Sequence, residues 1–236
     1  MPQPQVNRAC GAAVLLLALA CTPANNKQQS SESTTVVRAE TATVSAATRA
    51  PTDSNITRAD LARIQGSPTA PLWVIEVSDF QCPYCKQWHD ETYPMLRDQY
   101  VKTGKIRLAY VNFPLAMHAH AFPAAEAAMC AGAQDKFWQM HDALFSSQHG
   151  WEDLQSTGAV FDSLAQSTGV EMTRWRDCMK SGKMRALIEA DHDRAERAGA
   201  SATPSFMIGN KLIAGAQPLE EFRKAIDSAM VKNRQQ

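Results

Sequence analysis

The chain has 236 residues, of which 44% are hydrophobic and 20% charged, which is ordinary for a globular core and enough for one medium-sized domain with extensions. The formal net charge is zero and no basic stripe is present, so nucleic acid is not expected as a partner. Two of the six cysteines lie in an apolar N-terminal segment. The other four are an even number, as expected for two disulfides in an oxidising compartment.

The N-terminal segment has the features of a secretory signal. Its apolar run, Ala9–Ala20, has 12 residues, fewer than the roughly 20 that span a bilayer. The run closes with LALAC, which resembles a lipobox whose cysteine, Cys21, is lipidated and becomes the first mature residue. Ordinary cleavage before Cys21 is the alternative, but it would leave an unpaired thiol in an oxidising space. We therefore expect residues 1–21 to be a lipoprotein-type signal, and Thr22 after the cysteine favours the outer membrane.

Residues 22–55 are rich in serine, threonine, alanine, asparagine and glutamine and carry no apolar periodicity. Such a segment buries too little surface to offset its conformational entropy, so we predict a disordered tether. The folded domain is then expected over residues 56–236.

Strand and helix patterns alternate through this domain. Pro71–Phe80 is an apolar, β-branched run that predicts a buried strand, and a helical stretch follows it as far as Tyr100. Pro94 is expected to kink that helix, because proline lacks an N–H and clashes with the preceding turn. Lys105–Phe113 is a second strand candidate.

A long helical region comes next, before the chain returns to strands. The helical segments are Ala119–Ala133, Asp135–Ser147, Gly158–Thr168, Thr173–Ser181 and Lys183–Gly199. The short strands Ser205–Ile208 and Lys211–Ala214 follow, joined by a Gly-Asn turn that suits a hairpin, and Leu219–Val231 forms a last helix. The predicted class is α/β, with a helical insertion at about 114–200.

The sequence Cys82-Pro83-Tyr84-Cys85 directly follows the first predicted strand, so Cys82 begins the next helix. Unpaired backbone N–H groups and the helix dipole stabilise a thiolate at that position, and Pro83 in the first turn sacrifices no hydrogen bond. A spacing of three residues puts both sulfurs on one face, within bonding reach. We expect Cys82 to be the exposed nucleophile and Cys85 the buried resolving thiol.

Two other roles for this motif are open. It could be half of a zinc site, but structural zinc needs four ligands, and the sequence has no second C-x-x-C and no suitably spaced histidine pair, so no metal is expected. It could also be a purely structural disulfide, although such a short loop at a helix start is strained and labile. The Thr203-Pro204 dipeptide, at the entrance of a strand, is a weak signal by itself, because an X-Pro bond adopts the cis form at low cost.

Together these motifs resemble the DsbA family of envelope disulfide oxidoreductases over residues 70–231. The matching residues are Ser78-Asp79-Phe80-Gln81, the C-P-Y-C motif, Asn112-Phe113-Pro114-Leu115 with His118, the alanine-rich Ala124–Ala131, Lys136-Phe137-Trp138 with His141, Leu144-Phe145, and Thr203-Pro204-Ser205-Phe206. The resemblance implies a thioredoxin-like fold with an inserted helical subdomain. It also implies that the redox-active disulfide is the only reactive group, with no added cofactor.

The resemblance assigns two further site features. Thr203-Pro204 would be the cis-proline loop on which substrate backbone docks, and Glu76 would be the buried acid that manages protons near the resolving cysteine. A structural ion pair is the alternative for Glu76. The acid's basic partner in the family is not evident, because Leu108 falls at about its position, with Arg107 next to it.

Two residues depart from the pattern of the strongest oxidases. Tyr84 replaces a histidine between the cysteines, so no adjacent cation lowers the pKa of Cys82. Thr203 before the proline is a residue that the family shares with isomerases and reductases. Both departures suggest a less oxidising disulfide.

Cys130 and Cys178 lie in separate predicted helices of the insertion. A disulfide between them would close a loop of about 48 residues and stabilise the fold by about 4 kcal/mol. Some family members carry such a second bridge, and two buried free thiols are the alternative. His118, His120 and His141 are interpreted as packing residues, with His118 the one expected nearest the active site.

These observations favour an oxidase that donates the Cys82–Cys85 disulfide to thiols of secreted or envelope proteins and is reoxidised by a quinone-coupled membrane partner. A reductase or isomerase that a membrane donor keeps reduced is the alternative. A holdase that merely retains the fold is a third hypothesis, against which the intact C-P-Y-C motif argues. The expected location is the periplasm, with a lipid anchor in the outer membrane.

Overall fold

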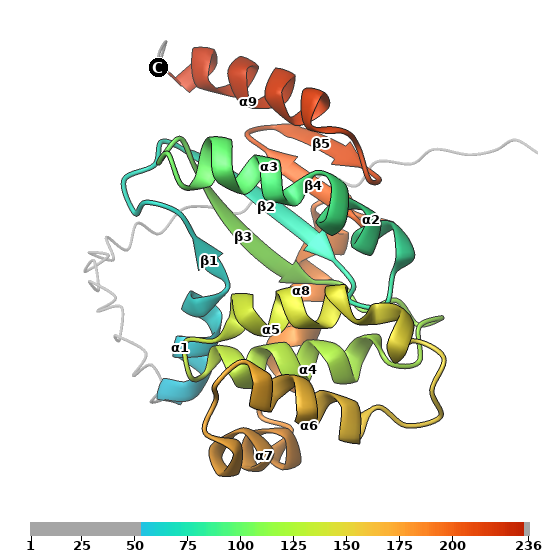
Figure 1. The fold of residues 1–236 in the computed structure, drawn as a ribbon. Helices are drawn as coiled ribbons and strands as arrows, with labels where there is room; N and C mark the ends of the chain where they lie inside the picture. Colours follow the sequence, from blue (N-terminus) through green and yellow to red (C-terminus); the bar gives the residue numbers. More distant parts are fainter. Residues whose placement is uncertain (1–52, 234–236) are drawn as a thin grey trace, which may run out of the picture. The chain divides into compact units, whose positions relative to one another are not determined.

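A five-stranded sheet in the order β1-β3-β2-β4-β5 organises residues 53–233, which are the residues that the computed structural model describes (Figure 1). The central strand β2 (Leu72–Ser78) runs parallel to β3 (Ile106–Asn112) and antiparallel to β4 (Ser205–Ile208). Strands β1 (Ile64–Gln65) and β5 (Lys211–Ala214) form the antiparallel edges. The helical connection from β2 to β3 allows these two strands to lie parallel.

The register of the central strands decides which side chains share a face. Glu76 of β2 lies directly opposite Tyr110 of β3, and Trp73 lies opposite Arg107. Because side chains alternate along a strand, Glu76 and Tyr110 point to one face of the sheet while Trp73 and Arg107 point to the other.

The segment after β2 is broken into short helical pieces, as proline near its middle predicts. Helix α2 (Pro83–Glu91) ends before Thr92, α3 (Tyr93–Leu96) has Pro94 in its first turn, and a wider π-type turn (Arg97–Val101) completes the segment. A proline tolerated at a helix start but not inside a helix accounts for the break.

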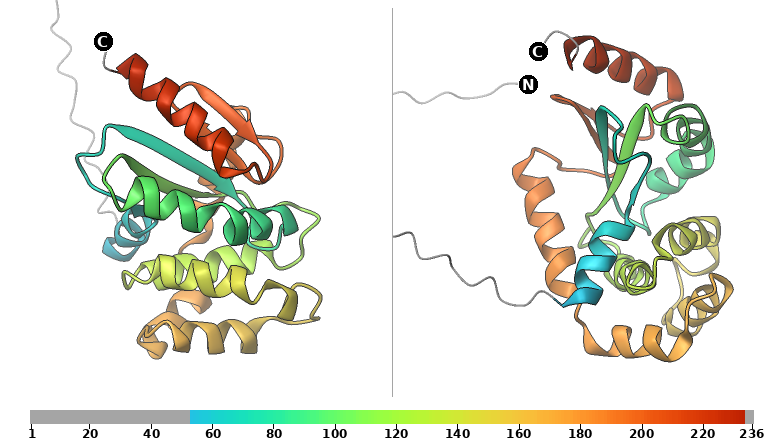
Figure 2. Two further views of the ribbon diagram at one scale, coloured as in Figure 1. Left: turned by 45° about the horizontal axis from the view of Figure 1, so that its top comes forward. Right: turned by 90° about the vertical axis from the view of Figure 1, so that its left-hand side faces the viewer.

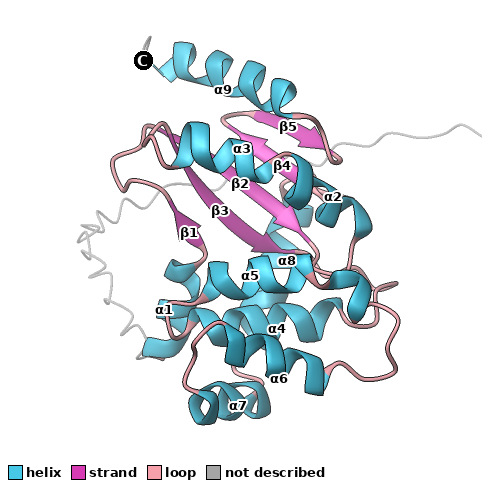
Figure 3. Ribbon diagram, viewed as in Figure 1, coloured by secondary structure: helices cyan, strands magenta, loops and turns pink. Residues whose placement is uncertain are grey.

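Five helices lie between β3 and β4, and one follows the hairpin. They are α4 (Ala121–Gly132), α5 (Phe137–Ser146), α6 (Gly158–Ser167), α7 (Met172–Ser181) and α8 (Arg185–Arg197), followed after β5 by α9 (Leu219–Asn233). Figure 2 shows α8 on one face of the sheet and α2 and α3 on the other, while α4 to α7 stack together at one end. Figure 3, coloured by secondary structure, shows the strands together in the sheet and helices α4 to α7 grouped beside it.

Two large hydrophobic clusters and a small one form the core of the described residues. The first contains residues of helices α4 through α8 and of the active-site turn, and the second packs α2, α3 and α9 against the sheet. The small one packs Ala195 of α8 against Val77 of β2. Trp138 of α5 contacts both large clusters. The C-P-Y-C motif therefore lies where the sheet and the inserted helices meet.

The start of the domain differs from the prediction. Helix α1 (Ser54–Ala62) begins where a tether was expected, and Asp53 caps it by accepting a hydrogen bond of 2.9 Å from the Asn55 N–H. The helix is polar and buries only Ala59 completely, which packs against α4, so its sequence has little apolar periodicity to reveal it. Arg63 at its C-terminal end is held by an ion pair with the buried Asp191 of α8.

The chain divides into two units, Met1–Ala47 and Thr48–Gln236, and the described residues all belong to the second. The expected signal over residues 1–21, the lipidation site Cys21 and the tether up to residue 52 lie outside the described part. From residue 53 to residue 233, no helix combines the length and the apolar character needed to cross a bilayer.

Candidate active site

The two cysteines of the motif lie at the start of α2. Cys82 is the N-cap, Pro83 occupies the first helical position, and both Cys82 and Cys85 are thiols. Cys85 is fully buried, as predicted, but Cys82 is only 3% exposed, so its expected exposure is wrong. The exposed members of the motif are Pro83 and Tyr84, and Tyr84 has 63% of its surface accessible.

The Thr203-Pro204 loop explains why Cys82 is covered. Its peptide bond is cis, and the Thr203 carbonyl oxygen lies 3.4 Å from the Cys82 sulfur and accepts a hydrogen bond from its protonated form. The two residues are 121 positions apart in the chain and meet because β4 pairs with β2. An incoming sulfur therefore has to approach Cys82 alongside this loop.

The two thiols have opposite acidities. A hydrogen bond from the Cys85 side chain, assisted by Thr203 and by backbone N–H groups at the start of α2, lowers the pKa of Cys82 to about 6. Burial, together with the neighbouring Cys82, raises the pKa of Cys85 well above its usual range. At neutral pH the pair therefore holds a thiolate at Cys82 and a thiol at Cys85.

Asp79, three residues before Cys82, organises the turn that carries the motif. Its carboxylate accepts hydrogen bonds from the backbone N–H groups of Gln81 and Leu115 and lies 2.7 Å from Nδ1 of His118. Its own N–H points at the Cys85 sulfur at 3.5 Å. His118 thus comes close to the site as expected, whereas the role of Asp79 was missed, because its partners lie 36 and 39 residues away.

Gln148 is a second residue that sequence reasoning missed. It is fully buried, and its side-chain amide donates to the carbonyl oxygens of Phe80 and Cys82 at 2.7 and 3.1 Å. The residue therefore ties the inserted helices to the backbone at the start of α2. No local pattern around Gln148 distinguishes it from a surface glutamine.

Glu76 lies beneath the motif on the same face of the sheet as Tyr110. It is fully buried, neither carboxylate oxygen has a hydrogen-bond partner among the described residues, and burial raises its pKa to about 8. Arg107 supplies no countercharge, because it stacks on Trp73 at 4.0 Å on the opposite face, and Leu108 is apolar and buried. Glu76 is thus a neutral acid at neutral pH.

Comparison with known proteins agrees with this geometry. Residues 58–228 match the family model described as Thioredoxin. The chain is 24% identical over 173 residues to disulfide bond formation protein D of Bacillus subtilis, a match covering 71% of this chain and 76% of that protein. The crystal structure of Wolbachia pipientis alpha-DsbA1 superposes with a TM-score of 0.64 and 25% identity, covering 72% of this chain and 92% of that one. The chain belongs to the DsbA-like branch of the thioredoxin family.

This membership confirms the predicted α/β fold with a helical insertion, in a family of thiol–disulfide oxidoreductases. One further relative is a much longer protein. The chain is 31% identical over 176 residues to the Na(+)/H(+) antiporter NhaA 1 of Salinispora arenicola, covering 74% of this chain but 26% of the antiporter. The chain therefore corresponds to about a quarter of that relative's length.

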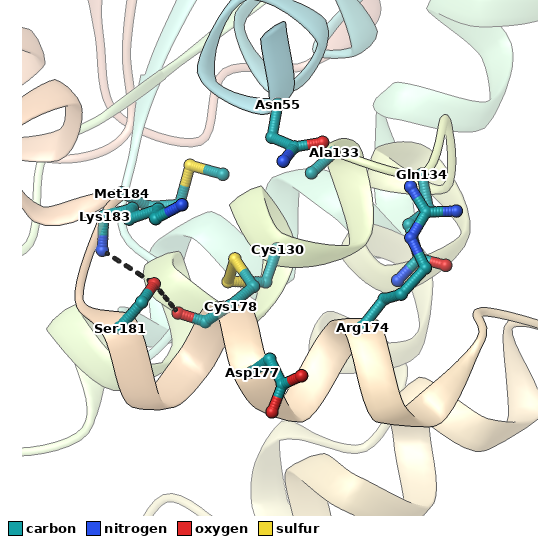
Figure 4. Close-up of a pocket in the computed structure, with 10 residues that line it drawn as sticks. All are labelled: Asn55, Cys130, Ala133, Gln134, Arg174, Asp177, Cys178, Ser181, Lys183 and Met184. Carbon is teal, nitrogen blue, oxygen red and sulfur yellow. Dashed lines mark hydrogen bonds between the residues drawn. A yellow bond between two sulfur atoms is a disulfide. The ribbon is translucent and has the colours of Figure 1, made fainter. Parts of the chain in front are cut away.

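The second cysteine pair of this DsbA-like chain lies away from the motif. Cys130 of α4 and Cys178 of α7 form a disulfide with their Cα atoms 5.7 Å apart. Figure 4 shows the bond on the wall of a cavity of about 240 Å³, which is also lined by Asn55 of α1 and by Lys183 in the link between α7 and α8. Cys130 is buried and Cys178 is partly exposed, so the bond fastens α7 to the outside of the helical stack.

A cluster of histidines and acids lies behind the motif. One ring nitrogen each of His89 and His141 and one Asp142 oxygen lie within 4.8 Å of one another, a spacing that metal ligands also show. Here Asp142 accepts hydrogen bonds from both histidines, at 2.8 Å from His141 and 3.4 Å from His89, and Arg97 lies 3.7 Å from its other oxygen. The carboxylate is therefore already charge-balanced by protein groups. His120 stays outside the cluster and contacts the Leu154 carbonyl oxygen.

Proposed function

We propose that this chain oxidises pairs of thiols in proteins of the bacterial cell envelope by donating its Cys82–Cys85 disulfide. The observation that carries the proposal is the opposite acidity of the two thiols. A stabilised thiolate at Cys82 is a good leaving group and favours the reduced enzyme, which makes the disulfide an oxidant. The names of relatives such as the Bacillus subtilis disulfide bond formation protein D support the same direction.

The reaction proceeds by two exchanges. A substrate thiolate attacks the Cys82 sulfur, the Cys82–Cys85 bond breaks, and Cys85 leaves as a thiolate that takes up a proton. The second substrate thiolate then attacks the substrate sulfur of the mixed disulfide and releases Cys82 as its stabilised thiolate. Two electrons pass from the substrate to the enzyme, and the substrate gains one disulfide. The cis Thr203-Pro204 loop, which covers Cys82, is positioned to align the substrate backbone.

The acidity of Cys82 also bounds the strength of the oxidant. A nucleophilic cysteine has a pKa of about 7 in thioredoxin and about 3.5 in DsbA, whose potentials are about −270 and −120 mV. With a pKa of about 6, Cys82 falls between them and nearer thioredoxin. We expect a potential between these two values, in keeping with Tyr84 and Thr203 in place of the residues of the strongest oxidases.

The proposal includes a place and a partner. Residues 1–21 would be the lipoprotein-type signal, Cys21 the lipid anchor in the outer membrane, and the following residues a tether that lets the domain reach thiol-bearing proteins of the periplasm. A quinone-coupled membrane oxidase would return Cys82 and Cys85 to the disulfide. No further cofactor is needed, because the two sulfurs carry both electrons.

The decisive experiment measures the reduction potential of Cys82–Cys85 against glutathione, together with its redox state in cells. A potential well above that of thioredoxin and a mainly oxidised pair in cells support the oxidase. A potential near −270 mV with a mainly reduced pair would instead make the chain a reductase or isomerase. For location, labelled lipid precursor should enter wild-type protein but not a Cys21→Ser variant, and equal labelling of both would overturn the anchor.

A further inference from the structure

Five polar atoms beneath the active site are buried without a hydrogen-bond partner among the described residues. They are the two carboxylate oxygens of Glu76, the hydroxyls of Ser78 and Tyr110, and Nε2 of His141. Buried polar atoms are nearly always satisfied, so a group of unsatisfied ones close to a reactive cysteine calls for an explanation. All four residues are buried.

Glu76 and His141 share the same neighbours. Tyr110 is the cross-strand partner of Glu76, and its ring lies edge-on to the His141 ring with centroids 5.4 Å apart. Tyr93 is within electrostatic reach of Glu76, and its ring lies 5.4 Å from that of His141. Asp142 likewise acts electrostatically on Glu76 and is hydrogen-bonded to His141. Three shared neighbours place the acid and the imidazole in one buried chamber.

Cys85 borders the same chamber. The charges of both Glu76 and Cys85 raise the pKa of Tyr110, in addition to its burial. Tyr110 is therefore close to both groups, and the resolving thiol, the acid and the imidazole surround one phenol.

Asp142 determines which nitrogen of His141 can accept a proton. Although burial opposes it, hydrogen bonds from His141 and His89 hold the pKa of Asp142 well below its usual range, so it remains a carboxylate. It accepts a hydrogen bond from Nδ1 of His141 at 2.8 Å, and burial lowers the pKa of His141 to about 4, so the ring is neutral. The proton therefore resides on Nδ1, and Nε2 presents a lone pair to the chamber.

We propose that His141, oriented by Asp142, is the positioning base of Glu76 and connects the Cys85 proton to solvent. This inference rests on the proposed thiol–disulfide exchange at Cys82–Cys85, in either direction of electron flow. His141, on helix α5, is then the basic partner of Glu76. The β3 residues at the corresponding positions, Arg107 and Leu108, do not provide one.

The proton transfers balance in both half-reactions. When the disulfide is reduced, the Cys85 thiolate takes the proton of neutral Glu76, and the resulting carboxylate is protonated again through His141. When the enzyme is reoxidised, neutral Glu76 first passes its proton to Nε2 of His141, and Nδ1 releases a proton to Asp142, whose side chain is 41% exposed to solvent. The Glu76 carboxylate formed in this way then takes the proton of the Cys85 thiol.

The charged groups around the chamber are compatible with this path. His89 faces the imidazole from α2 with ring centroids 5.3 Å apart, and Arg97 lies beside Asp142 from the turn after α3. Tyr93 keeps its proton, because burial raises its pKa well above its usual range. Glu76, with a pKa of about 8, and Cys82, with a pKa of about 6, are therefore poised to exchange protons near neutral pH.

The test measures the pKa of Glu76 in the oxidised full-length protein from its infrared carbonyl band, assigned by its loss in Glu76→Gln. His141→Asn keeps a hydrogen-bonding group near Asp142 but removes Nε2, the acceptor that protonated Glu76 would reach by rotating its side chain within the chamber. We expect the pKa of Glu76 to fall by about one unit, the worth of one hydrogen bond. His192→Asn is the matched control, because His192 also stacks on an aromatic ring, Phe113, but from α8. It should leave the band unchanged.

Kinetics separate a proton path from a packing role. Reduction by dithiothreitol should slow about tenfold in Glu76→Gln and in His141→Asn, and the double variant should be no slower than Glu76→Gln alone. Asp142→Asn, at a partly exposed position, should reproduce the His141→Asn result if that variant folds poorly, because asparagine can donate to Nδ1 and reverse the tautomer.

An unchanged Glu76 pKa in both variants, or additive rate losses in the double variant, would overturn the inference. Binding of Zn²⁺ that requires Asp142 and shifts the Glu76 band would also overturn it, because the cluster would then be a metal site. A thioredoxin-like potential would overturn only the proposed direction of electron flow. The two failures are therefore distinguishable.

Discussion

The two cysteine pairs of this chain have the same chemistry available and are used differently. Cys82 and Cys85 are three residues apart in one helical turn, where backbone N–H groups and the Thr203 loop act on the sulfurs. Cys130 and Cys178 are 48 residues apart and join two helices that would otherwise meet only through packing. The short loop favours a reversible bond with a stabilised thiolate, and the long loop favours a bond that stabilises the fold. Separation and surroundings, and not the residue type, assign the two roles.

The largest expected effect is the loss of activity when the Cys82–Cys85 pair is changed, which distinguishes this pair from Cys130–Cys178. Cys82→Ser should abolish oxidation of reduced substrate and reduction of insulin, because the nucleophile and leaving group are lost. Cys85→Ser should accumulate mixed disulfides with client proteins, visible on non-reducing gels. Substrate oxidation retained by Cys82→Ser would mean that another cysteine or another function carries the activity.

A large effect on stability is expected from the acid beneath the motif. The pKa of Glu76 is about 8 in the folded protein and 4.5 in a model peptide, so the folded state binds the proton more tightly between these values. Stability from this group is complete below about pH 4.5 and is lost as pH rises through about 8. Glu76→Gln should therefore stabilise the protein at about pH 9 by up to about 5 kcal/mol, measured by guanidinium unfolding. Equal pH dependence in variant and wild type would contradict the assigned burial.

The second pair is tested by its removal. A Cys130→Ala/Cys178→Ala variant should lose about 4 kcal/mol of unfolding free energy, the chain-entropy value for a loop of 48 residues. Its exchange rate at Cys82 should stay within about twofold of wild type at a temperature where both are folded, because distant sites act independently. A large loss of exchange rate with little loss of stability would erase the distinction between the pairs.

A smaller effect is expected at the loop that covers the nucleophile. Thr203→Val keeps the shape of the side chain and removes its hydroxyl, which helps to lower the pKa of Cys82. The pKa should rise by about one unit, measured from the ultraviolet absorbance of the thiolate during a pH titration. Thr173→Val, an exposed change in α7, is the control and should leave that titration unchanged.

Local patterns predicted the elements whose periodicity is strong. The hairpin strands Ser205–Ile208 and Lys211–Ala214 occur where the sequence places them, and Pro94 does interrupt the helical segment. Helix α1 was not predicted because only Ala59 is fully buried and the stabilising contacts come from α4 and Asp191, far along the chain. A helix that buries one alanine and is held at its end by an ion pair has little apolar periodicity, so its sequence does not reveal it.

In the active site, features that depend on neighbouring residues were predicted, and contacts between distant residues were not. The motif and its helix-start position were readable from sequence, because they depend on neighbouring residues. The burial of Cys82 was not, since it depends on a loop 121 residues away, and neither were the contacts of Asp79 and Gln148. The family resemblance predicted Glu76 as a site residue. The role proposed for His141 follows only from the structure, where its Nε2 is unpaired and its ring contacts Tyr110.

The Cys130–Cys178 bond has a consequence for mechanical force. A chain pulled at both ends can extend only around a covalent loop, so the residues between positions 130 and 178 contribute no length while the bond is intact. At about 3.4 Å per extended residue, reducing that bond would release about 160 Å of additional contour. Stretching single molecules before and after reduction would report the state of this disulfide as a length.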